Sequence, residues 1–372
     1  MAKEKKRIKK RKNAVFSFLI SLTSLLIKII LVLIPLALGV FMYFNSPINT
    51  EIRLNYSDSD AIRIDEDGSY LIDVRRGETS QSVGMRLERN GLITNRYFWN
   101  LLCRFESEYL KTGTYRLNLP ASMLSIHRLL TSGREVLHKV TVPEGVTLLK
   151  TSRIIEEAGI CSAQEFLAAA RDVSIIRSYN IPNNSMEGYL FPDTYFFPSG
   201  YPGELVVRKM ADNFFKKMEE ISPAFRNLSI TELNNIVIMA SIIEREYRVA
   251  DEAPLISGVF NNRIRINMAL QSCATVEYII TEIQGKPHPN QILFSDLEIV
   301  NPYNTYRNRG LPPGPISAPG VVALRAAVYP DRTNYLYFRV IDTSSGRHYF
   351  SRTYDEHIRA GLLYTPNLRH RP

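Results

Sequence analysis

The chain has 372 residues, of which 45% are hydrophobic and 22% are charged, so there is room for a membrane anchor and two or three modest domains. Its formal charge of +9 would suit a nucleic-acid-binding protein, but eight basic residues and one acid lie within residues 1–12. Without that segment and Lys28, 37 basic and 36 acidic residues remain and nearly balance. The charge is therefore a tail, and no nucleic acid is expected as a partner.

Residues 14–44 are almost wholly apolar and predict a membrane anchor. A membrane-spanning helix needs about 20 apolar residues, which residues 25–44 supply, and Lys28 lies where its long side chain can reach the membrane surface. Positive charge stays on the cytoplasmic side, so residues 1–24 form a cytoplasmic basic tail and the approach to the membrane, and the body after Asn45 lies outside. The alternative is a cleaved signal peptide, although no small-residue cleavage site follows the apolar run.

Residues 45–69 are polar and are interpreted as a linker with one edge strand. An internal repeat with an offset of 68 residues follows. The eight matched positions are Val74, Gly77, Thr79, Leu87, Glu88, Gly91, Leu92 and Phe98, which recur as Val142, Gly145, Thr147, Ile155, Glu156, Gly159, Ile160 and Phe166.

In each copy a short strand (70–74 or 139–142) is followed by a helix that Thr79 or Thr147 caps and that stops at Gly91 or Gly159. Thr94 or Ser162 is expected to cap a second helix, and a strand at 113–117 would complete a β-α-α-β unit in the first copy. Residues 70–138 thereby resemble a LysM domain, a module that binds glycans containing N-acetylglucosamine, and residues 139–182 form a second repeat-like segment. A purely structural role for both copies is the alternative.

Residues 183–364 are interpreted as one further domain, followed by a tail at 365–372. Helices are expected at 204–221, 231–248 and 321–327, with a β pair at 335–341 and 348–351. The predicted class for the whole chain is α+β, with an N-terminal transmembrane helix, the LysM-like module and a mixed α+β domain.

The helix at 231–248 is the most informative segment. Ser229 and Glu232 form a capping box at its start, and residues 236–243 are apolar nearly all round, so the helix is expected to be buried. Glu244 lies at the end of the apolar stripe, where loss of solvent would raise its pKa and keep it protonated as a general acid requires. The alternative is a solvated glutamate paired with Arg245 or Arg248.

Three further clusters carry polar groups. Residues 187–198 combine Glu187 and Asp193 with five aromatic residues, a composition that suits a sugar ligand or, alternatively, a loop packed on the core. Residues 301–320 hold so many prolines and glycines that they must form an ordered loop, and residues 270–276 lie between that loop and the helix. The three cysteines form no CxxC motif and the six histidines are scattered, so neither a metal nor a cofactor is expected.

These clusters together resemble one family. Ala240–Glu246, Leu270–Ser272, Pro302–Tyr306 and Gly310–Ile316 follow the order seen in MltG-type (YceG-like) endolytic murein transglycosylases, and Glu187–Tyr195 resembles another block of that family. The likeness runs from the anchor to about Tyr349. Two positions depart from the family pattern, since Tyr247 stands where Thr is common and Cys273-Ala274 stands where Asp-Pro is common.

The resemblance implies an enzyme of the bacterial inner membrane that cleaves nascent peptidoglycan strands between N-acetylmuramic acid and N-acetylglucosamine. It would act as a lyase that terminates strand elongation, with peptidoglycan synthases as further partners. The catalytic glutamate of the family falls on Glu244, and Glu246 is the rival on the same turn. Residues expected to bind substrate are Glu187, Asp193, Tyr195, Gln271, Tyr303, Asn304, Thr305 and Tyr306.

Two other functions stay open at the level of sequence. One is a non-catalytic peptidoglycan-binding scaffold held by the anchor, which would need none of the motifs after residue 230. The other is a muramidase that uses two carboxylates, such as Glu244 and Glu187.

Overall fold

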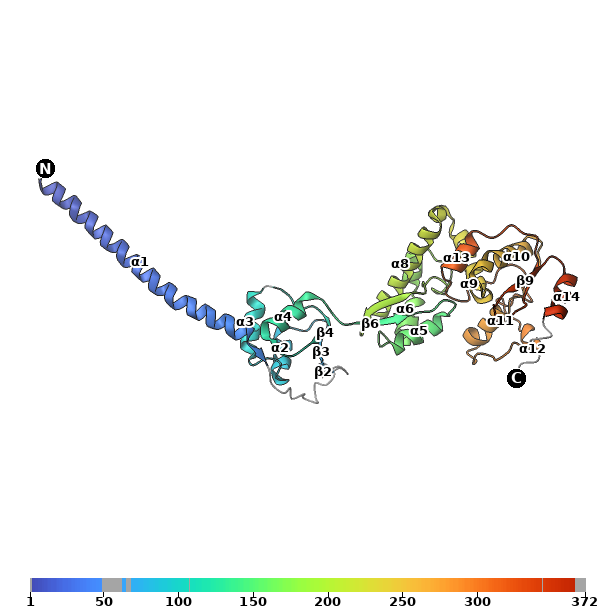
Figure 1. Ribbon diagram of the computed structural model, residues 1–372, viewed down its shortest axis with the longest axis horizontal. Helices are drawn as coiled ribbons and strands as arrows, with labels where there is room; N and C mark the ends of the chain where they lie inside the picture. The colour runs from blue at the N-terminus through green and yellow to red at the C-terminus, as the bar shows by residue number, and fades with distance from the viewer. Residues whose placement is uncertain (1, 49–61, 65–67, 107, 343, 365–372) are drawn as a thin grey trace. The chain divides into compact units, whose positions relative to one another are not determined.

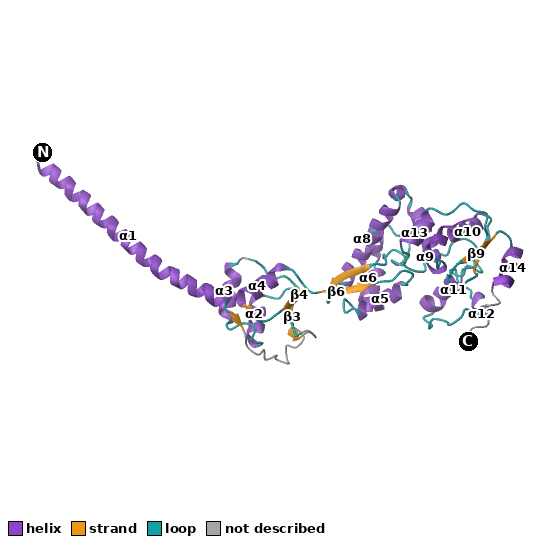
Figure 2. Cartoon of the chain, in the orientation of Figure 1, coloured by secondary structure: helices purple, strands orange, loops and turns teal. Residues whose placement is uncertain are grey.

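A computed structural model describes residues 2–48, 62–64, 68–106, 108–342 and 344–364, with only the backbone for residues 2–20 and 364. The chain divides into two compact units, Met1–Val136 and Leu137–Pro372. Helices and short antiparallel strand pairs alternate in both (Figures 1 and 2), so the predicted α+β class is confirmed.

The first unit begins with a single long helix, α1 (Ala2–Asn45). Its segment Ser21–Asn45 is long and apolar enough to cross a membrane. The helix leads directly into the folded unit, because Phe44 is buried in that unit's core and β1 (Pro47–Ile48) pairs with β5 (Ala121–Ser122). The predicted linker 45–69 is thus partly strand, while its residues 49–61 and 65–67 lie outside the described residues.

The sheet of the first unit has the order β2-β3-β4 and is antiparallel throughout. Strand β2 (Ile62–Ile64) is the expected edge strand, and the predicted β-α-α-β order follows it. The elements are β3 (Tyr70–Val74), α2 (Ser80–Arg89), α3 (Arg96–Phe105) and β4 (Gly113–Leu117), with α4 (Met123–Ser132) packed beside them.

The predicted cap of α2 is confirmed, whereas the predicted cap of α3 is wrong. Thr79 caps α2 as expected, and Gly91 takes the left-handed conformation that ends it. The expected cap of α3 at Thr94 is wrong, because Asn95 accepts hydrogen bonds from the amides of the first turn. Thr94 instead bonds the Tyr43 hydroxyl at 2.6 Å, so contact with α1 takes its side chain out of the capping position.

The second unit begins with the second repeat copy, whose first strand pairs with a strand that the sequence did not predict. Strand β6 (Leu137–Thr141) is followed by α5 (Leu148–Glu157) and α6 (Ala163–Ala170), capped by Thr147 and Ser162 as expected. After α7 (Val173–Ser178), strand β7 (Thr194–Pro198) pairs antiparallel with β6. Residues 194–198 were interpreted as part of a loop, because three consecutive aromatic residues conceal the alternation in which Tyr195 and Phe197 are buried and Phe196 is exposed.

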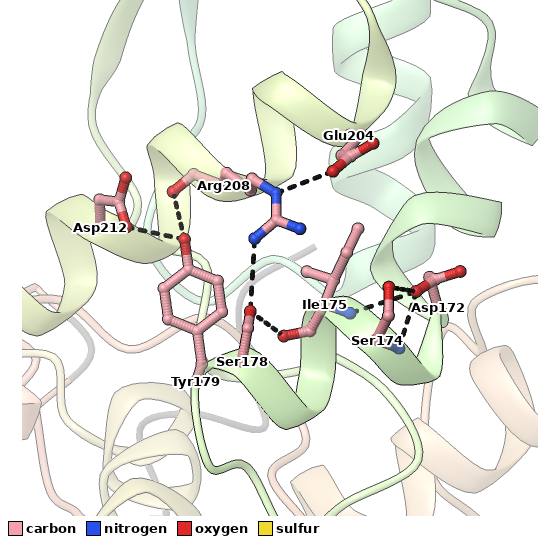
Figure 3. A network of polar contacts seen from close by, with 8 residues as sticks. All are labelled: Asp172, Ser174, Ile175, Ser178, Tyr179, Glu204, Arg208 and Asp212. Carbon is pink, nitrogen blue, oxygen red and sulfur yellow. Dashed lines mark hydrogen bonds and ion pairs between the residues drawn. The ribbon is translucent and has the colours of Figure 1, made fainter.

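A polar network fixes α7 against α8 (Gly203–Ile221), as Figure 3 shows. Arg208 donates to Glu204 at 2.9 Å and to the Ser178 hydroxyl at 3.3 Å. The Tyr179 hydroxyl donates to Asp212 at 2.7 Å. These bonds join the repeat copy to the helical part of the unit, so both belong to one folded body.

Helix α9 (Ile230–Glu246) is the centre of the second unit. Its start is confirmed, because Ser229 and Glu232 form the reciprocal capping box, and residues 237–243 are all buried. Helix α13 (Val321–Val328) packs along it, with α10 (Ala253–Arg265) and α11 (Cys273–Tyr278) beside it. The remaining elements are 3-10 turns at Pro223–Asn227 and Ala250–Glu252, a π-helical turn at Ile279–Ile283, α12 (Phe294–Leu297), the pair β8 (Tyr337–Val340) and β9 (His348–Ser351), and α14 (Tyr354–Tyr364).

Candidate active site

Glu244 lies in the last turn of α9, where the buried helix meets a wall of loops. One carboxylate oxygen accepts a hydrogen bond from the Gly320 amide at 2.8 Å, and the other accepts one from the Tyr247 hydroxyl at 3.3 Å. Arg245 points elsewhere, since its guanidinium donates to the Gly145 carbonyl and binds Glu277. The alternative in which Glu244 pairs with Arg245 is therefore wrong. Glu244 is partly buried, and the predicted rise of its pKa by loss of solvent agrees with this environment.

Burial raises the pKa of Glu244 to about 7. The hydrogen bond from Gly320 opposes this rise, the negative charge of Glu144 adds to it, and the bond from Tyr247 opposes it. A carboxyl group with a pKa near neutrality can donate a proton and take one back at working pH, which suits acid–base chemistry.

Two loops that are far apart in sequence form the wall beside Glu244. The Gly145 amide donates to the Ala318 carbonyl at 2.8 Å, and the Ala318 amide donates to the Val146 carbonyl at 2.8 Å. Gly145 has φ of +74°, a conformation that a side chain would disfavour, and the turn it makes brings residues 144–146 against 318–320. The second repeat copy thus contributes directly to the surroundings of Glu244.

The pairing of these loops brings a second carboxylate to the site. A Cβ built on Gly320 would lie 1.8 Å from a carboxylate oxygen of Glu144, while the amide of the same glycine bonds Glu244. From these distances and standard bond lengths, oxygens of the two carboxylates lie within about 8 Å of each other. Glu144 itself is exposed, so it faces solvent beside the mostly buried Glu244.

A hydroxyl group inside α9 ties the loop 310–320 to the helix. The Ser241 hydroxyl accepts from the Ile316 amide at 3.0 Å and donates to the Ile238 carbonyl at 2.7 Å. The Ser317 hydroxyl donates to the Ser241 carbonyl at 3.0 Å. All of these groups are buried, so the loop that supplies the Gly320 amide is held in one place.

A cleft of about 850 Å³ adjoins this wall and separates α5 from the segment after α11. Val146, next to the Gly145 turn, and Arg245, next to Glu244, belong to its lining. Its walls carry both charge signs, with Lys150, Arg153, Lys286 and His288 among the basic residues and Glu157, Glu277 and Glu282 among the acidic ones. A polar ligand of extended shape would find donors and acceptors along it.

The rival carboxylate Glu246 lies in a different environment. It accepts a hydrogen bond from the Ser272 hydroxyl, and burial raises its pKa. The Ser272 amide donates to the Thr305 hydroxyl at 3.0 Å, which in turn bonds Thr275 at 2.9 Å. Glu246 therefore anchors the segments 270–276 and 301–306 to the end of α9.

The residues predicted to bind substrate on those segments divide into two groups. Asn304 and Thr305 are fully buried, and Asn304 donates to the carbonyls of residues 297 and 299, so their side chains shape the loop. Gln271 is exposed, with a left-handed φ of +52°. Tyr303 packs against Tyr278 with ring centroids 5.2 Å apart, and the Tyr306 hydroxyl contacts the Cys273 thiol at 3.0 Å.

The predicted residues of segment 187–195 lie in the repeat half of the unit. Both oxygens of Glu187 accept from the Leu148 amide at the start of α5, and burial raises the pKa of Glu187 to about 8. Tyr195 is buried in the core and donates to the Phe191 carbonyl at 2.6 Å. Asp193 is exposed and accepts from Asn213 at 3.1 Å. Both buried residues also reach beyond the repeat copy. Tyr195 accepts a hydrogen bond from Asn213 of α8 at 3.1 Å, and the charge of Glu187 raises the pKa values of Tyr278 and Tyr303.

Glu144 and Gly320 were not singled out from the sequence, although one signal was available. The two repeat copies agree at the turn glycine, yet Arg76 precedes it in the first copy and Glu144 precedes it in the second. A charge reversal at the most regular point of a repeat marks a position where the copies have different roles. Among the described residues, no group of three His, Cys, Asp or Glu side chains lies together as a metal site would require.

A mostly buried carboxyl group with a near-neutral pKa, held by an amide and a hydroxyl, has the properties that acid–base chemistry requires, and the residues next to it, Arg245 and the Gly145 turn, border a polar cleft. The chain belongs to the YceG-like family, whose sequence profile matches residues 72–361. It is 30% identical over 310 residues to the endolytic murein transglycosylase of Bacillus subtilis, a match that covers 79% of this chain and 84% of the relative.

Other relatives agree with this assignment. The endolytic murein transglycosylase of Streptococcus pneumoniae is 27% identical over 319 residues, which cover 77% of this chain and 57% of that relative's length. A crystal structure of a YceG-like protein from Listeria monocytogenes is similar with a TM-score of 0.53 and 29% identity, and the match covers 78% of this chain and 98% of that one.

Proposed function

We propose that this protein is an endolytic murein transglycosylase that cleaves the bond between N-acetylmuramic acid and N-acetylglucosamine within nascent glycan strands. The observation that carries the proposal is Glu244, a mostly buried carboxyl group with a pKa of about 7 that lies against the Gly145 turn, whose neighbour Val146 lines a polar cleft. The names of the relatives from B. subtilis and S. pneumoniae support the substrate class.

In this mechanism Glu244 acts first as an acid and then as a base. Its proton passes to the glycosidic oxygen as the bond from that oxygen to C1 of the muramic acid breaks. The C6 hydroxyl oxygen of the same sugar then bonds to C1, and its proton returns to the Glu244 carboxylate, which leaves a 1,6-anhydro ring. The nucleophile belongs to the substrate, so no water is consumed and one carboxyl group is sufficient.

The neighbours of Glu244 have separate tasks in this cycle. The Gly320 amide and the Tyr247 hydroxyl stabilise the carboxylate that remains after proton donation. Burial and the negative charge of Glu144 favour the protonated form, and their balance with the two hydrogen bonds leaves the pKa of Glu244 at about 7, where the group can both donate and accept a proton. The glycan is proposed to contact three residues whose side chains are at least partly exposed to solvent, namely Gln271, Tyr303 and Tyr306.

The cellular setting follows from the anchor. Segment Ser21–Asn45 of α1 would span the inner membrane once, with the basic tail in the cytoplasm and both folded units outside. In that position the first unit, which has the β-α-α-β order of a LysM-like module, would bind glycan near the synthases that produce it. Cleavage there would terminate strand elongation.

One observation favours a second candidate, a muramidase that uses two carboxylates. Oxygens of Glu144 and Glu244 lie no farther than about 8 Å apart, which is close enough for the two carboxyl groups to act as a pair. Inverting glycosidases separate their carboxyl groups by roughly 6.5–9.5 Å with a water between them, and retaining ones by about 5–5.5 Å. Glu187, the partner expected from sequence, is instead buried and bound to the Leu148 amide. In the second candidate Glu144 would activate the water.

Product analysis separates these functions. Peptidoglycan is incubated with the detergent-solubilised full chain, with Glu244→Gln and with Glu246→Gln, which changes the rival carboxylate two residues farther along α9, and the products are identified by mass spectrometry. The proposal expects anhydro-muramic ends from the wild type and from the Glu246 variant but none from Glu244→Gln. Reducing ends would support the muramidase, and equal activity of Glu244→Gln would refute the assigned residue. Absence of cleavage by every form, with glycan binding retained, would favour a scaffold.

A further inference from the structure

The surface of α3 that faces solvent is strongly apolar. Tyr97, Leu101 and Phe105 recur every four residues along it and are 69%, 39% and 76% exposed, and Phe98 beside them is 40% exposed. The opposite side of the helix holds Trp99 and Leu102, both buried in the core of the unit. A helix with one apolar side in the core has no need of a second one, so the exposed side calls for a partner.

The position of α3 relative to the membrane span identifies that partner. The ring of Phe98 lies 4.8 Å from the ring of Tyr43 and 6.2 Å from that of Phe44, both in the last turn of α1. The Tyr43 hydroxyl also bonds Thr94 at 2.6 Å, one residue before the cap of α3. The start of α3 is therefore fixed to the end of the span.

The length of the span sets the depth of this junction. At 1.5 Å per residue, the 25 residues of Ser21–Asn45 extend about 37 Å, slightly more than the hydrocarbon core of about 30 Å. Tyr43 then lies in the interfacial layer, where tyrosine is typically enriched. Phe98 lies at the same depth in the membrane as Tyr43, because their rings are in contact. Phe105 is seven residues later in α3, which corresponds to about 10 Å along the helix axis.

From this continuity we infer that α3 lies on the outer surface of the bilayer, with Tyr97, Phe98, Leu101 and Phe105 inserted into its interfacial layer. The unit would then have two attachments to the membrane, the span and the adjoining helix face. The inference rests on α1 as a membrane span and is independent of the catalytic proposal.

Apolar insertion, and not charge, would hold the helix there. Helix α3 contains two arginines and no acid, but Arg96 is near Glu88 at 3.7 Å, and Glu106 follows the helix directly. The attachment should consequently persist at high salt. A purely electrostatic attachment would weaken, because added salt shortens the Debye length and screens the attraction.

The test uses the full chain reconstituted in vesicles of zwitterionic lipid with bromine atoms on the acyl chains, which quench tryptophan fluorescence on contact. Phe105→Trp adds a reporter at the end of the face that lies farther from Tyr43, and Gln81→Trp adds a matched reporter at an exposed position of α2. The buried Trp99, the chain's one natural tryptophan, gives a constant background that the unmodified protein measures.

We expect the added emission of Phe105→Trp to be blue-shifted and to fall by about half or more in brominated vesicles, since interfacial helices bury their apolar face about 5–10 Å deep. The emission of Gln81→Trp should be unchanged, and the difference should survive 0.5 M salt, roughly a Debye length of 4 Å. Equal quenching of both reporters, or of neither, would overturn the inference. A blue shift of Phe105→Trp on addition of soluble glycan fragments, without quenching by bromine, would also overturn it in favour of a sugar-binding face.

The result does not depend on one substitution being tolerated. Hydrogen exchange of the α3 amides in the unmodified protein should be slower in vesicles than in delipidated, detergent-solubilised protein. The α2 amides should exchange at the same rate in both preparations. Equal exchange of α3 in the two states would contradict the attachment.

Discussion

Replacing Glu144 with Gln should move the alkaline limit of activity to lower pH. The Glu144 carboxylate lies within about 8 Å of the Glu244 carboxylate and raises the pKa of Glu244, so loss of its charge makes proton release from Glu244 easier. Two unit charges 8 Å apart interact by roughly 0.5 to 2 kcal/mol at effective dielectric constants between 80 and 20. That energy corresponds to a decrease of about 0.4 to 1.5 in the pKa of Glu244.

The assay is the initial rate of anhydro-product formation from purified uncrosslinked glycan strands between pH 5 and pH 9. Well above the pKa of about 7, the rate follows the protonated fraction of Glu244, so the variant should be slower than the wild type by about 3- to 30-fold. Near pH 5 Glu244 is protonated in both proteins, and the two rates should agree. Glu219→Gln, which removes an exposed carboxylate on α8, is the charge-matched control and should leave the profile unchanged.

Tyr247→Phe should shift the alkaline limit of the pH–rate profile in the opposite direction to Glu144→Gln, which provides a second test of the electrostatic argument. The Tyr247 hydroxyl donates to Glu244 and lowers its pKa, so its loss should move the alkaline limit to higher pH. A loss of rate in Glu144→Gln by one constant factor at every pH would refute the electrostatic reasoning and indicate that Glu144 contacts substrate or activates water. Displacement of both variants in the same direction would refute it as well.

Three further predictions concern stability, measured by denaturant unfolding of the detergent-solubilised protein. Gly188→Ala should destabilise the second unit by about 2–4 kcal/mol, because φ is +80° and the new methyl group would lie 2.4 Å from Pro315. The control Gly200→Ala should cost only about 1–2 kcal/mol, because φ there is +68° but no atom lies within 4 Å of the new methyl group. Equal costs for the two variants would contradict the packing argument. Ser241→Ala should cost about 1–3 kcal/mol by leaving a buried amide of the loop 310–320 without an acceptor, and a neutral result would mean that the loop relaxes. Burial raises the pKa of Glu187 to about 8 in the folded protein, so its contribution to stability should fall as pH rises from about 4.5 to 8. Glu244 and Glu246, whose pKa values burial also raises, contribute declines of the same sign, so Glu187→Gln should make the total decline smaller without abolishing it. A decline as large in the variant as in the wild type would refute the contribution of Glu187.

Local features of the fold could be predicted because short-range chemistry determines them. The Ser229–Glu232 capping box sets the start of α9 within one residue, and the unbroken apolar stretch after it predicts that the helix is buried. The burial of Glu244 follows from the same stripe. The repeat spacing likewise places α2, α5 and α6 with their caps.

Features that depend on contacts between distant segments could not be predicted. The pairing of Gly145 with Ala318 joins residues 173 positions apart, and no local pattern marks it. Glu144 was therefore missed as a neighbour of Glu244. The cap of α3 moved from Thr94 to Asn95 for the same kind of reason, because Thr94 is bonded to α1. Strand β7 was missed because its aromatic residues occupy both faces, which removes the polar–apolar alternation that indicates a strand.

The hydrogen bond from Gly320 to Glu244 has a consequence for the order in which the protein becomes active. Synthesis proceeds from the N-terminus, so Glu244 emerges well before its amide donor and before Ala318, which secures the turn at Gly145. A chain halted between residues 245 and 319 would contain the carboxyl group but not the amide that helps to set its proton affinity. Glu244 therefore acquires its final surroundings only after residues 318–320 have been made and have paired with the turn at Gly145.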